Sequence, residues 1–459
     1  MKEASVDYPP KNVELLFFAL NLQEIYSIYL FIYMSKPFLF LAKRSLLLLS
    51  ALLAIAPLRA QHTVPTKSTT TAILADTAAT PPYEITRRMP RFYEQLKQQL
   101  TFPMAWGRST TTDFNQWRSE GRQLLTDCLQ LLPPPPTDWQ LQVEATEPRQ
   151  ALPCDQPTSG NGQQSSGNGR YEARRITFNV SAWSRVPAYL LVPEGPGPFP
   201  AVLLLHDHGA HFTIGKEKMV RPFGVSAEVQ QDAEEWTTRC YDGSFVGDSL
   251  AARGYVVLSV DALFWGERGC QEGPDYDVQQ ALASNLMQMG SSWPSVIHAD
   301  DLRSAELLAS LPMVDSKRIG CLGFSMGAYR AWMLAAWSDV VSCSAAVSWL
   351  NTTDELMTLT NNQNKGGSAF SMLIPTLRRY MDYPHVAALA CPKPALFFNG
   401  TRDKLFPVAG VEAAYTHLHE VWRSQGAEQQ LTTRLWDEKH FFNRTMQQEV
   451  LRFFDKKLK

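Results

Sequence analysis

The chain has 459 residues, 45% of them hydrophobic and 19% charged, and its formal net charge is -2. This composition excludes a disordered chain, and the near-neutral charge provides no overall field that would favour nucleic acid or an anionic membrane. The seven cysteines are scattered without a C-x-x-C pair, so we expect neither a disulfide framework nor a cysteine zinc site. The length suits one large domain with added segments, or two domains.

The N-terminal part of the chain carries an expected export signal. A basic stretch after Met34 leads into the apolar run Ser45–Ala56, and Ala60-Gln61 fits a cleavage point. The run is too short to cross a bilayer comfortably. We therefore expect a signal peptide over residues 34–60, with translation starting at Met34 and residues 1–33 as an upstream extension, and a periplasmic or extracellular protein. A longer membrane anchor and a core helix are the alternatives.

A region of mixed character follows. Thr, Ala and Pro dominate residues 61–87, which is typical of a linker. Apolar residues then repeat at helical spacing over Arg88–Leu132, until the prolines at 133–136 end the helix. The polar stretch Ser159–Gly169 predicts a flexible loop. We expect residues 88–170 to form an N-terminal helical segment that caps the main domain.

Strand and helix patterns alternate over residues 171–459. Strands are expected at Arg175–Val180, Val186–Val192, Ala201–Leu205, Gly254–Val260, Arg318–Phe324, Ser344–Trp349, Ala395–Asn399 and Leu431–Trp436. Helices are expected at Asp248–Arg253, His298–Leu311, Ala328–Trp337, Val411–Gln425 and Thr445–Lys457. Such alternation predicts an α/β fold with a mostly parallel central sheet and helices on both faces. Residues 351–390 form a long insertion that we expect to act as a lid.

The strongest local motif is Gly323-Phe324-Ser325-Met326-Gly327, which fits G-x-S-x-G between an expected strand and an expected helix. So tight a turn leaves almost no room for a side chain two positions to either side of the serine, and glycine stands at both positions. The turn would lift the Ser325 hydroxyl clear of the sheet as a nucleophile. It would also aim the backbone N–H of Met326 at the substrate oxygen, as one half of an oxyanion hole.

A serine nucleophile needs a base, and the base needs an acid that orients it. His440 follows the last expected strand, in a loop before the terminal helix, where the base of such a fold belongs. Asp403 follows the strand ALFFN and lies between Ser325 and His440 in the chain, as the order Ser, Asp, His requires. Asp354 and Asp437 are the competing acids. We predict the triad Ser325, Asp403 and His440.

The second oxyanion donor should come from the loop after the strand Ala201–Leu205. This loop reads His206-Asp207-His208-Gly209-Ala210-His211, and the donor is the N–H of His208 or of Ala210, with His208 preferred. The dense histidines do not match the spacing of a metal site, so we expect no metal and no cofactor. The following Gly209–Lys216 stretch imitates a phosphate-binding loop but fails its spacing.

Two charged residues follow the strand Gly254–Val260, within Trp265-Gly266-Glu267-Arg268-Gly269. Because this loop lies at the same sheet edge as the serine turn, Glu267 and Arg268 are candidate substrate-binding residues. An arginine there could bind a carboxylate or a sugar hydroxyl. The alternative is an ion pair between the two side chains within the loop.

Three segments together resemble a known group of proteins. They are LLLHDHGAHFTIGKEKM, GFSMGAYRAW, and NGTRDKLFP followed by WDEKHFF, and they resemble secreted bacterial α/β-hydrolases of the acetyl xylan esterase-like, dienelactone hydrolase-related family. True dienelactone hydrolases use a cysteine where this chain has Ser325, so that activity is not expected. The resemblance implies the α/β-hydrolase fold and the removal of acetyl or similar groups from plant polysaccharide.

The expected function is serine-dependent hydrolysis of carboxylic esters through an acyl-enzyme, with a small-molecule or polysaccharide ester as substrate. We expect no nucleic-acid partner and no stable membrane insertion once the signal is cleaved. A serine peptidase of the same fold is one alternative. The other is a carbohydrate-binding protein that kept the fold and lost catalysis.

Overall fold

The computed structural model describes residues 83–86, 88–151, 169–358 and 370–459. They fall within one unit, Pro82–Lys459. The expected signal peptide, the upstream extension, nearly all of the linker and nearly all of the loop Ser159–Gly169 lie outside the described residues. Within the described part of the chain, no helix is long and apolar enough to cross a membrane.

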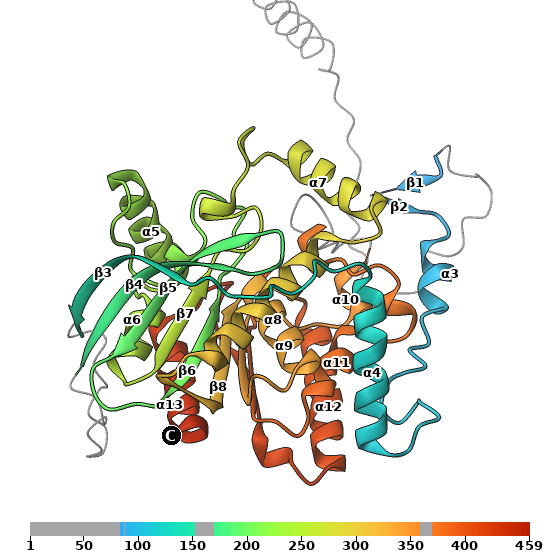
Figure 1. The fold of residues 1–459 in the computed structure, drawn as a ribbon. Helices are drawn as coiled ribbons and strands as arrows, with labels where there is room; N and C mark the ends of the chain where they lie inside the picture. The colour runs from blue at the N-terminus through green and yellow to red at the C-terminus, as the bar shows by residue number, and fades with distance from the viewer. Residues whose placement is uncertain (1–82, 87, 152–168, 359–369) are drawn as a thin grey trace, which may run out of the picture. The chain divides into compact units, whose positions relative to one another are not determined.

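A nine-stranded sheet forms the centre of the molecule (Figure 1). Its strands are β3 (Gln142–Gln150), β4 (Arg170–Asn179), β5 (Arg185–Pro193), β6 (Phe199–Leu205), β7 (Val256–Val260), β8 (Val314–Phe324), β9 (Cys343–Val347), β10 (Ala395–Gly400) and β11 (Leu431–Trp436). They follow the order β11-β10-β9-β8-β6-β7-β5-β4-β3. The pairs from β11 to β7 are parallel, and those from β7 to β3 are antiparallel. The predicted mostly parallel sheet is confirmed.

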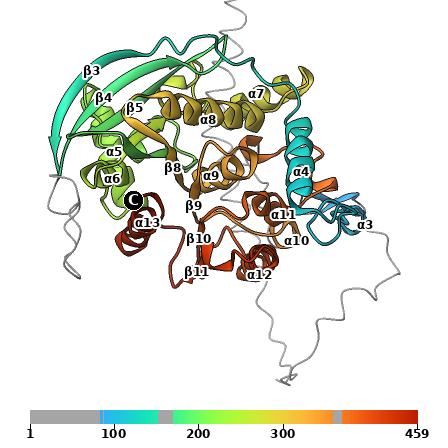
Figure 2. The same cartoon turned by 60° about the horizontal axis from the view of Figure 1, so that its bottom comes forward.

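Helices cover both faces of the sheet (Figure 2). They are α3 (Tyr93–Gln98), α4 (Phe114–Leu129), α5 (Ala227–Cys240), α6 (Val246–Ala252), α7 (Tyr276–Gln288), α8 (Trp293–Ser310), α9 (Met326–Trp337), α10 (Thr353–Leu356), α11 (Tyr383–Ala387), α12 (Val408–Ser424) and α13 (Arg444–Leu458). Apolar side chains of α4, α8, α9, α11 and α12 share one core, and those of α5, α6 and α13 share another.

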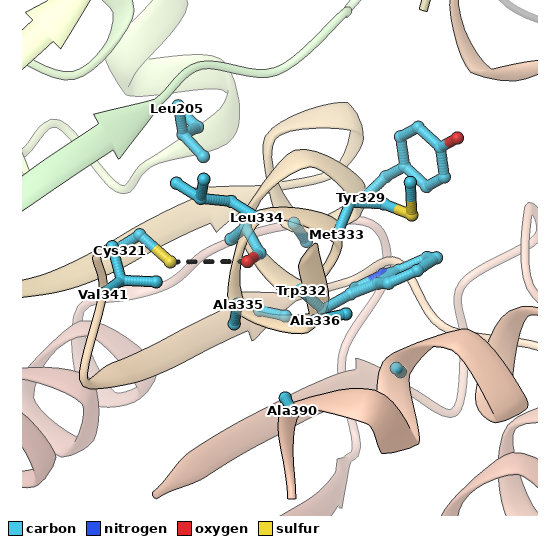
Figure 3. Packing of buried hydrophobic residues seen from close by; sticks show 14 of the residues in the cluster. Leu205, Cys321, Tyr329, Trp332, Met333, Leu334, Ala335, Ala336, Val341 and Ala390 are labelled. Carbon is cyan, nitrogen blue, oxygen red and sulfur yellow. Dashed lines mark hydrogen bonds between the residues drawn. The ribbon is translucent and has the colours of Figure 1, made fainter. Parts of the chain in front are cut away.

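The buried strands feed these two cores alternately. Along β6, Leu203 and Leu205 belong to the first core, whereas Val202 and Leu204 belong to the second. Successive strand side chains point to opposite faces, so a strand covered on both sides reads as a continuous apolar run. Figure 3 shows Leu205 beside the buried side of α9, where the Cys321 thiol donates to a carbonyl of that helix at 3.4 Å.

Several parts of the structure differ from the sequence prediction. The segment Arg88–Leu132 is not one helix: α3 and α4 are separated by a stretch that contains Pro103, which cannot continue a helix, and Gly107, whose φ is 83°. The expected helical segment before residue 170 also contributes β3, which pairs with β4 at the edge of the sheet. Helices α5 and α7 were not predicted.

Candidate active site

Ser325 occupies a sharp turn between β8 and α9. Its backbone has φ 55° and ψ -124°, a conformation that residues other than glycine rarely adopt. A Cβ atom on Gly323 would lie 1.9 Å from the carbonyl oxygen of Gly327, and one on Gly327 would lie 1.8 Å from that of Leu205. Both obstacles are backbone atoms that cannot move aside cheaply. Only glycine therefore fits on either side of the serine, as the motif predicted.

Three side chains from three separate loops meet at this turn. Ser325 Oγ lies 2.9 Å from His440 Nε2, and His440 Nδ1 lies 2.6 Å from Asp403 Oδ2. Asp403 follows β10, and His440 follows β11, so both come from the carboxyl ends of parallel strands. The tautomer with its proton on Nδ1 donates to Asp403 and can accept from the serine hydroxyl. The residues predicted as nucleophile, acid and base are brought together.

Two phenylalanine rings lie beside the histidine ring. Phe324 lies 4.9 Å from it and Phe406 lies 6.0 Å from it, measured between ring centres. The Asp403 carboxylate is fully buried, and its second oxygen accepts the Leu405 N–H at 2.9 Å. These contacts fix both members of the pair, which reduces the cost of ordering them during a reaction.

The competing acids lie elsewhere. Asp437 forms an exposed ion pair with Arg402 at 2.8 Å. Asp354 lies 3.8 Å from Lys97 and is likewise exposed. Neither contacts His440, so Asp403 is the carboxylate that the structure brings to the histidine.

A cavity of 460 Å³ opens beside the serine. Its wall includes Ser325 and His440, together with aromatic rings such as Trp236, Trp349 and Tyr383. The insertion 351–390, expected as a lid, supplies part of this wall through several of its described residues. A largely apolar cavity with a few polar groups is the usual form of a small-molecule site.

The loop after β6 reaches the same cavity with His208, Gly209 and Ala210. The Ala210 N–H donates to the His208 ring at 2.9 Å, so it is already used within the loop. Burial lowers the pKa of His208 to about 3, so the ring is neutral at ordinary pH. Of the two donors considered from the sequence, the N–H of Ala210 is thus occupied. The N–H of His208, the preferred donor, stays a prediction.

A buried lysine holds this loop from behind. Lys218 Nζ donates to three loop carbonyls, those of Asp207 at 3.0 Å, His208 at 3.2 Å and His211 at 2.9 Å. The Asp207 carboxylate lies 3.5 Å from the same ammonium group. Its other oxygen accepts from Tyr241 at 2.6 Å and from Trp236 at 3.2 Å. The ammonium group of Lys218 and the carboxylate of Asp207 are therefore both satisfied.

Sequence reasoning gave Lys218 no role. The segment GKEKM, residues 215–219, gave the only sign of such a role. Two lysines in a loop that follows a buried strand need anionic or carbonyl partners if they are buried. The neighbouring Lys216 is also buried and pairs with Asp261 at 2.9 Å and Glu267 at 2.6 Å.

The predicted substrate-binding pair is not brought to the cavity. Glu267 pairs with Lys216 and with Arg175, the latter at 2.7 Å. Arg268 is nearly buried and pairs with Asp300 at 2.6 Å. Neither residue lines the cavity, and the alternative ion pair between them is not formed either. Each charge had a partner far away in the sequence, which loop position alone could not reveal.

The histidines of the β6 loop have separate partners. The His206 ring accepts the Ala262 N–H at 3.0 Å, and His211 pairs with Asp232 at 2.6 Å while stacking on Trp236. Among the described residues, no group of three His, Cys, Asp or Glu side chains could hold a metal ion.

Comparison with known proteins relates the chain to hydrolases. Residues 241–449 match the model of the Dienelactone hydrolase family. A protein of Bacillus subtilis (strain 168), named "Putative hydrolase YtaP", is 27% identical over 282 residues, which cover 61% of this chain and 86% of that protein.

Two solved structures share the fold. A "putative acetyl xylan esterase" from Bacteroides fragilis NCTC 9343 has a TM-score of 0.55 at 16% identity, covering 75% of this chain and 82% of its own. A glucuronoyl esterase from Solibacter usitatus has a TM-score of 0.53 at 14% identity, covering 77% and 94%. These likenesses show the α/β-hydrolase fold, and residues 241–449 are similar to the Dienelactone hydrolase family.

Proposed function

We propose that the protein hydrolyses carboxylic esters through an acyl-enzyme on Ser325. The observation that carries this proposal is the chain of contacts from Ser325 through His440 to Asp403, at 2.9 and 2.6 Å. A serine hydroxyl is a weak nucleophile by itself and becomes an effective one beside an oriented imidazole. The cavity beside it supplies room for a substrate.

The proposed reaction has two halves. His440 takes the Ser325 proton as Oγ attacks the ester carbonyl, and it returns that proton to the departing alcohol. Water activated by the same ring then cleaves the acyl-enzyme and releases the acid. Asp403 stabilises the imidazolium in both halves. The N–H groups of Met326 and His208 stabilise the oxyanion. The N–H of Met326 is available because the first N–H of a helix has no partner within that helix.

We propose a carbohydrate ester, of the acetyl xylan type, as the substrate. Structures of the same fold include proteins described as acetyl xylan and glucuronoyl esterases. The aromatic wall formed by Trp236, Trp349 and Tyr383 suits the apolar faces of sugar rings. Export of the protein, which the N-terminal sequence predicts, would bring it to such a substrate.

A panel of substrates tests the proposal. Purified protein would be offered p-nitrophenyl acetate, acetylated xylan and a peptide p-nitroanilide. We expect release of p-nitrophenol and of acetate, and no cleavage of the amide. Amide cleavage that exceeds ester cleavage would instead support a serine peptidase. Binding to xylan without hydrolysis of either ester would support a carbohydrate-binding protein.

Lys218 is expected to position the loop after β6, which supplies the proposed oxyanion donor His208. In a trans peptide the C=O and N–H point in opposite directions. Since the carbonyls of Asp207 and His208 point at Lys218, the N–H groups of His208 and Gly209 point away from it. Replacing Lys218 with methionine should lower kcat by about 100- to 1000-fold, the usual cost of losing an oxyanion donor, and change KM little.

Steady-state kinetics on p-nitrophenyl acetate would measure this effect. Binding of a boronic acid, which forms a tetrahedral adduct with serine, should weaken in parallel with kcat. Lys317→Met, which makes the same substitution at an exposed site, is the matched control. A kcat of Lys218→Met that stays within threefold of wild type, in a folded protein, would remove Lys218 from this role.

A further inference from the structure

Arg378 is a cation in the wall of the cavity that forms no ion pair with any carboxylate of the described residues. It lies in the short helix η4 (Leu377–Arg379) and lines the same cavity as Ser325 and His440. Its guanidinium carbon lies 3.8 Å from the centre of the Tyr383 ring. Its Nε is buried without a hydrogen-bond partner, and no described carboxylate forms an ion pair with it. A partly buried guanidinium without acceptors is costly unless a ligand supplies them.

The neighbouring carboxylate of Asp382 is committed to other groups. It accepts the N–H groups of Thr353 and Tyr383, each at 2.9 Å, and also the Thr353 hydroxyl. These bonds cap the start of α11 and tie it to α10. Asp382 therefore attracts Arg378 only at longer range, and the guanidinium group forms no hydrogen bond to the described residues.

The remaining charges of the cavity have the same sign as Arg378. Arg239 and Lys439 also line the cavity, and neither forms an ion pair within the described residues. Among the described residues of the wall, the one acidic side chain is that of Asp207, whose carboxylate accepts from Tyr241 at 2.6 Å and lies against Lys218. The cavity is thus cationic in a chain whose net charge is -2.

We propose that Arg378 forms a carboxylate-binding subsite and that the substrate is an ester with a carboxylate near the bond that is cleaved. This inference rests on the proposed function and narrows its substrate class to acidic esters. The planar guanidinium can bind a carboxylate through two parallel hydrogen bonds, which fixes orientation as well as charge. The carboxylate can belong to the acyl part or to the alcohol part, such as an acetylated uronic acid residue.

Matched pairs of esters test the subsite. On the alcohol side, the pair is acetylated methyl galacturonoside and acetylated methyl galactoside, which differ in one carboxylate. On the acyl side, the pair is mono-p-nitrophenyl succinate and p-nitrophenyl butyrate. We expect wild type to favour the carboxylated member of at least one pair by about tenfold or more in kcat/KM, and the favoured pair identifies the side.

Variants connect this preference to one side chain. Arg378→Gln should lower kcat/KM for the favoured acidic ester by about 10- to 100-fold, mainly through KM, and change the neutral ester by less than threefold. Arg378→Lys should restore only part of the loss because lysine lacks the fork. Arg379→Gln, the same change at the adjacent exposed arginine outside the cavity wall, should behave as wild type. Equal losses on acidic and neutral esters, or none, would overturn the subsite.

A binding measurement separates this inference from the proposed function. By calorimetry, Ser325→Ala should bind methyl galacturonoside or succinate with higher affinity than the neutral methyl galactoside or butanol. Adding Arg378→Gln should abolish this difference in affinity. Such binding without ester hydrolysis by wild type would overturn the proposed function and leave the subsite standing. Hydrolysis of neutral and acidic esters at equal rates, with equal binding, would overturn the subsite alone.

Discussion

Replacing Ser325 with alanine is expected to lower kcat/KM for ester hydrolysis by about 10⁴- to 10⁶-fold. The change removes one oxygen, the atom 2.9 Å from His440 Nε2, and leaves the cavity and its other donors in place. Residual hydrolysis would come from binding and from the oxyanion donors acting on water. Because alanine keeps the Cβ of serine, the positive φ of 55° costs the variant no more than it costs wild type.

Initial rates on p-nitrophenyl acetate would measure this loss, and thermal unfolding would check the fold. Ser338→Ala, at the opposite end of α9 and outside the cavity, is the control and should keep full activity. An alkyl phosphonate that labels active serines should add its mass to wild type at Ser325 and leave Ser325→Ala unmodified. Esterase activity that survives in Ser325→Ala would end the assignment of this serine as nucleophile.

The strands and the serine turn could be predicted because their determinants are local. The strand run in β6 is apolar at every position, since both faces are covered. The glycines at 323 and 327 are required by backbone atoms within 2 Å of where a Cβ would stand, so the motif carries its own geometry. Asp403 and His440 could be placed because each directly follows a strand, and parallel strands end at one edge of the sheet.

Elements without a burial pattern escaped prediction. Strand β3 is an edge strand whose residues are mostly exposed, and it contains Pro148, so neither alternation nor an apolar run marks it. Helix α5 is largely polar and presents only a narrow buried face through Ala233 and Trp236. β3 is stabilised by pairing with β4, the next strand along the chain, which the residues of β3 alone do not reveal.

Separation along the chain also hides which charged residues pair with each other. Lys218 is ten or more positions from the carbonyl groups of Asp207 and His208 that it holds, and Glu267 pairs with Arg175 across 92 positions. Their role depends on which charges already have partners. Arg268 has such a partner and does not line the cavity, whereas Arg378 lines the cavity and forms no ion pair in the part of the chain that the structure describes. Sequence position alone could not separate the two arginines.

Replacing Asp403 with asparagine is expected to lower kcat by about 10⁴-fold, because it places the histidine proton on the wrong nitrogen. One oxygen of Asp403 already accepts the Leu405 N–H at 2.9 Å. The amide oxygen of the asparagine must take over that bond, which turns its NH₂ group toward His440 Nδ1. The ring then accepts at Nδ1 and carries its proton on Nε2, where it can no longer accept the proton of Ser325.

The expected fall in kcat would not come from lost packing, because aspartate and asparagine have nearly the same shape. The variant should keep its KM and its thermal unfolding temperature, while kcat on p-nitrophenyl acetate falls. Asp437→Asn makes the same exchange at the competing exposed carboxylate and should retain activity. If Asp403→Asn were as active as wild type and Asp437→Asn or Asp354→Asn were not, the orienting acid would have to be reassigned, since a histidine of this kind needs a carboxylate to hold its tautomer.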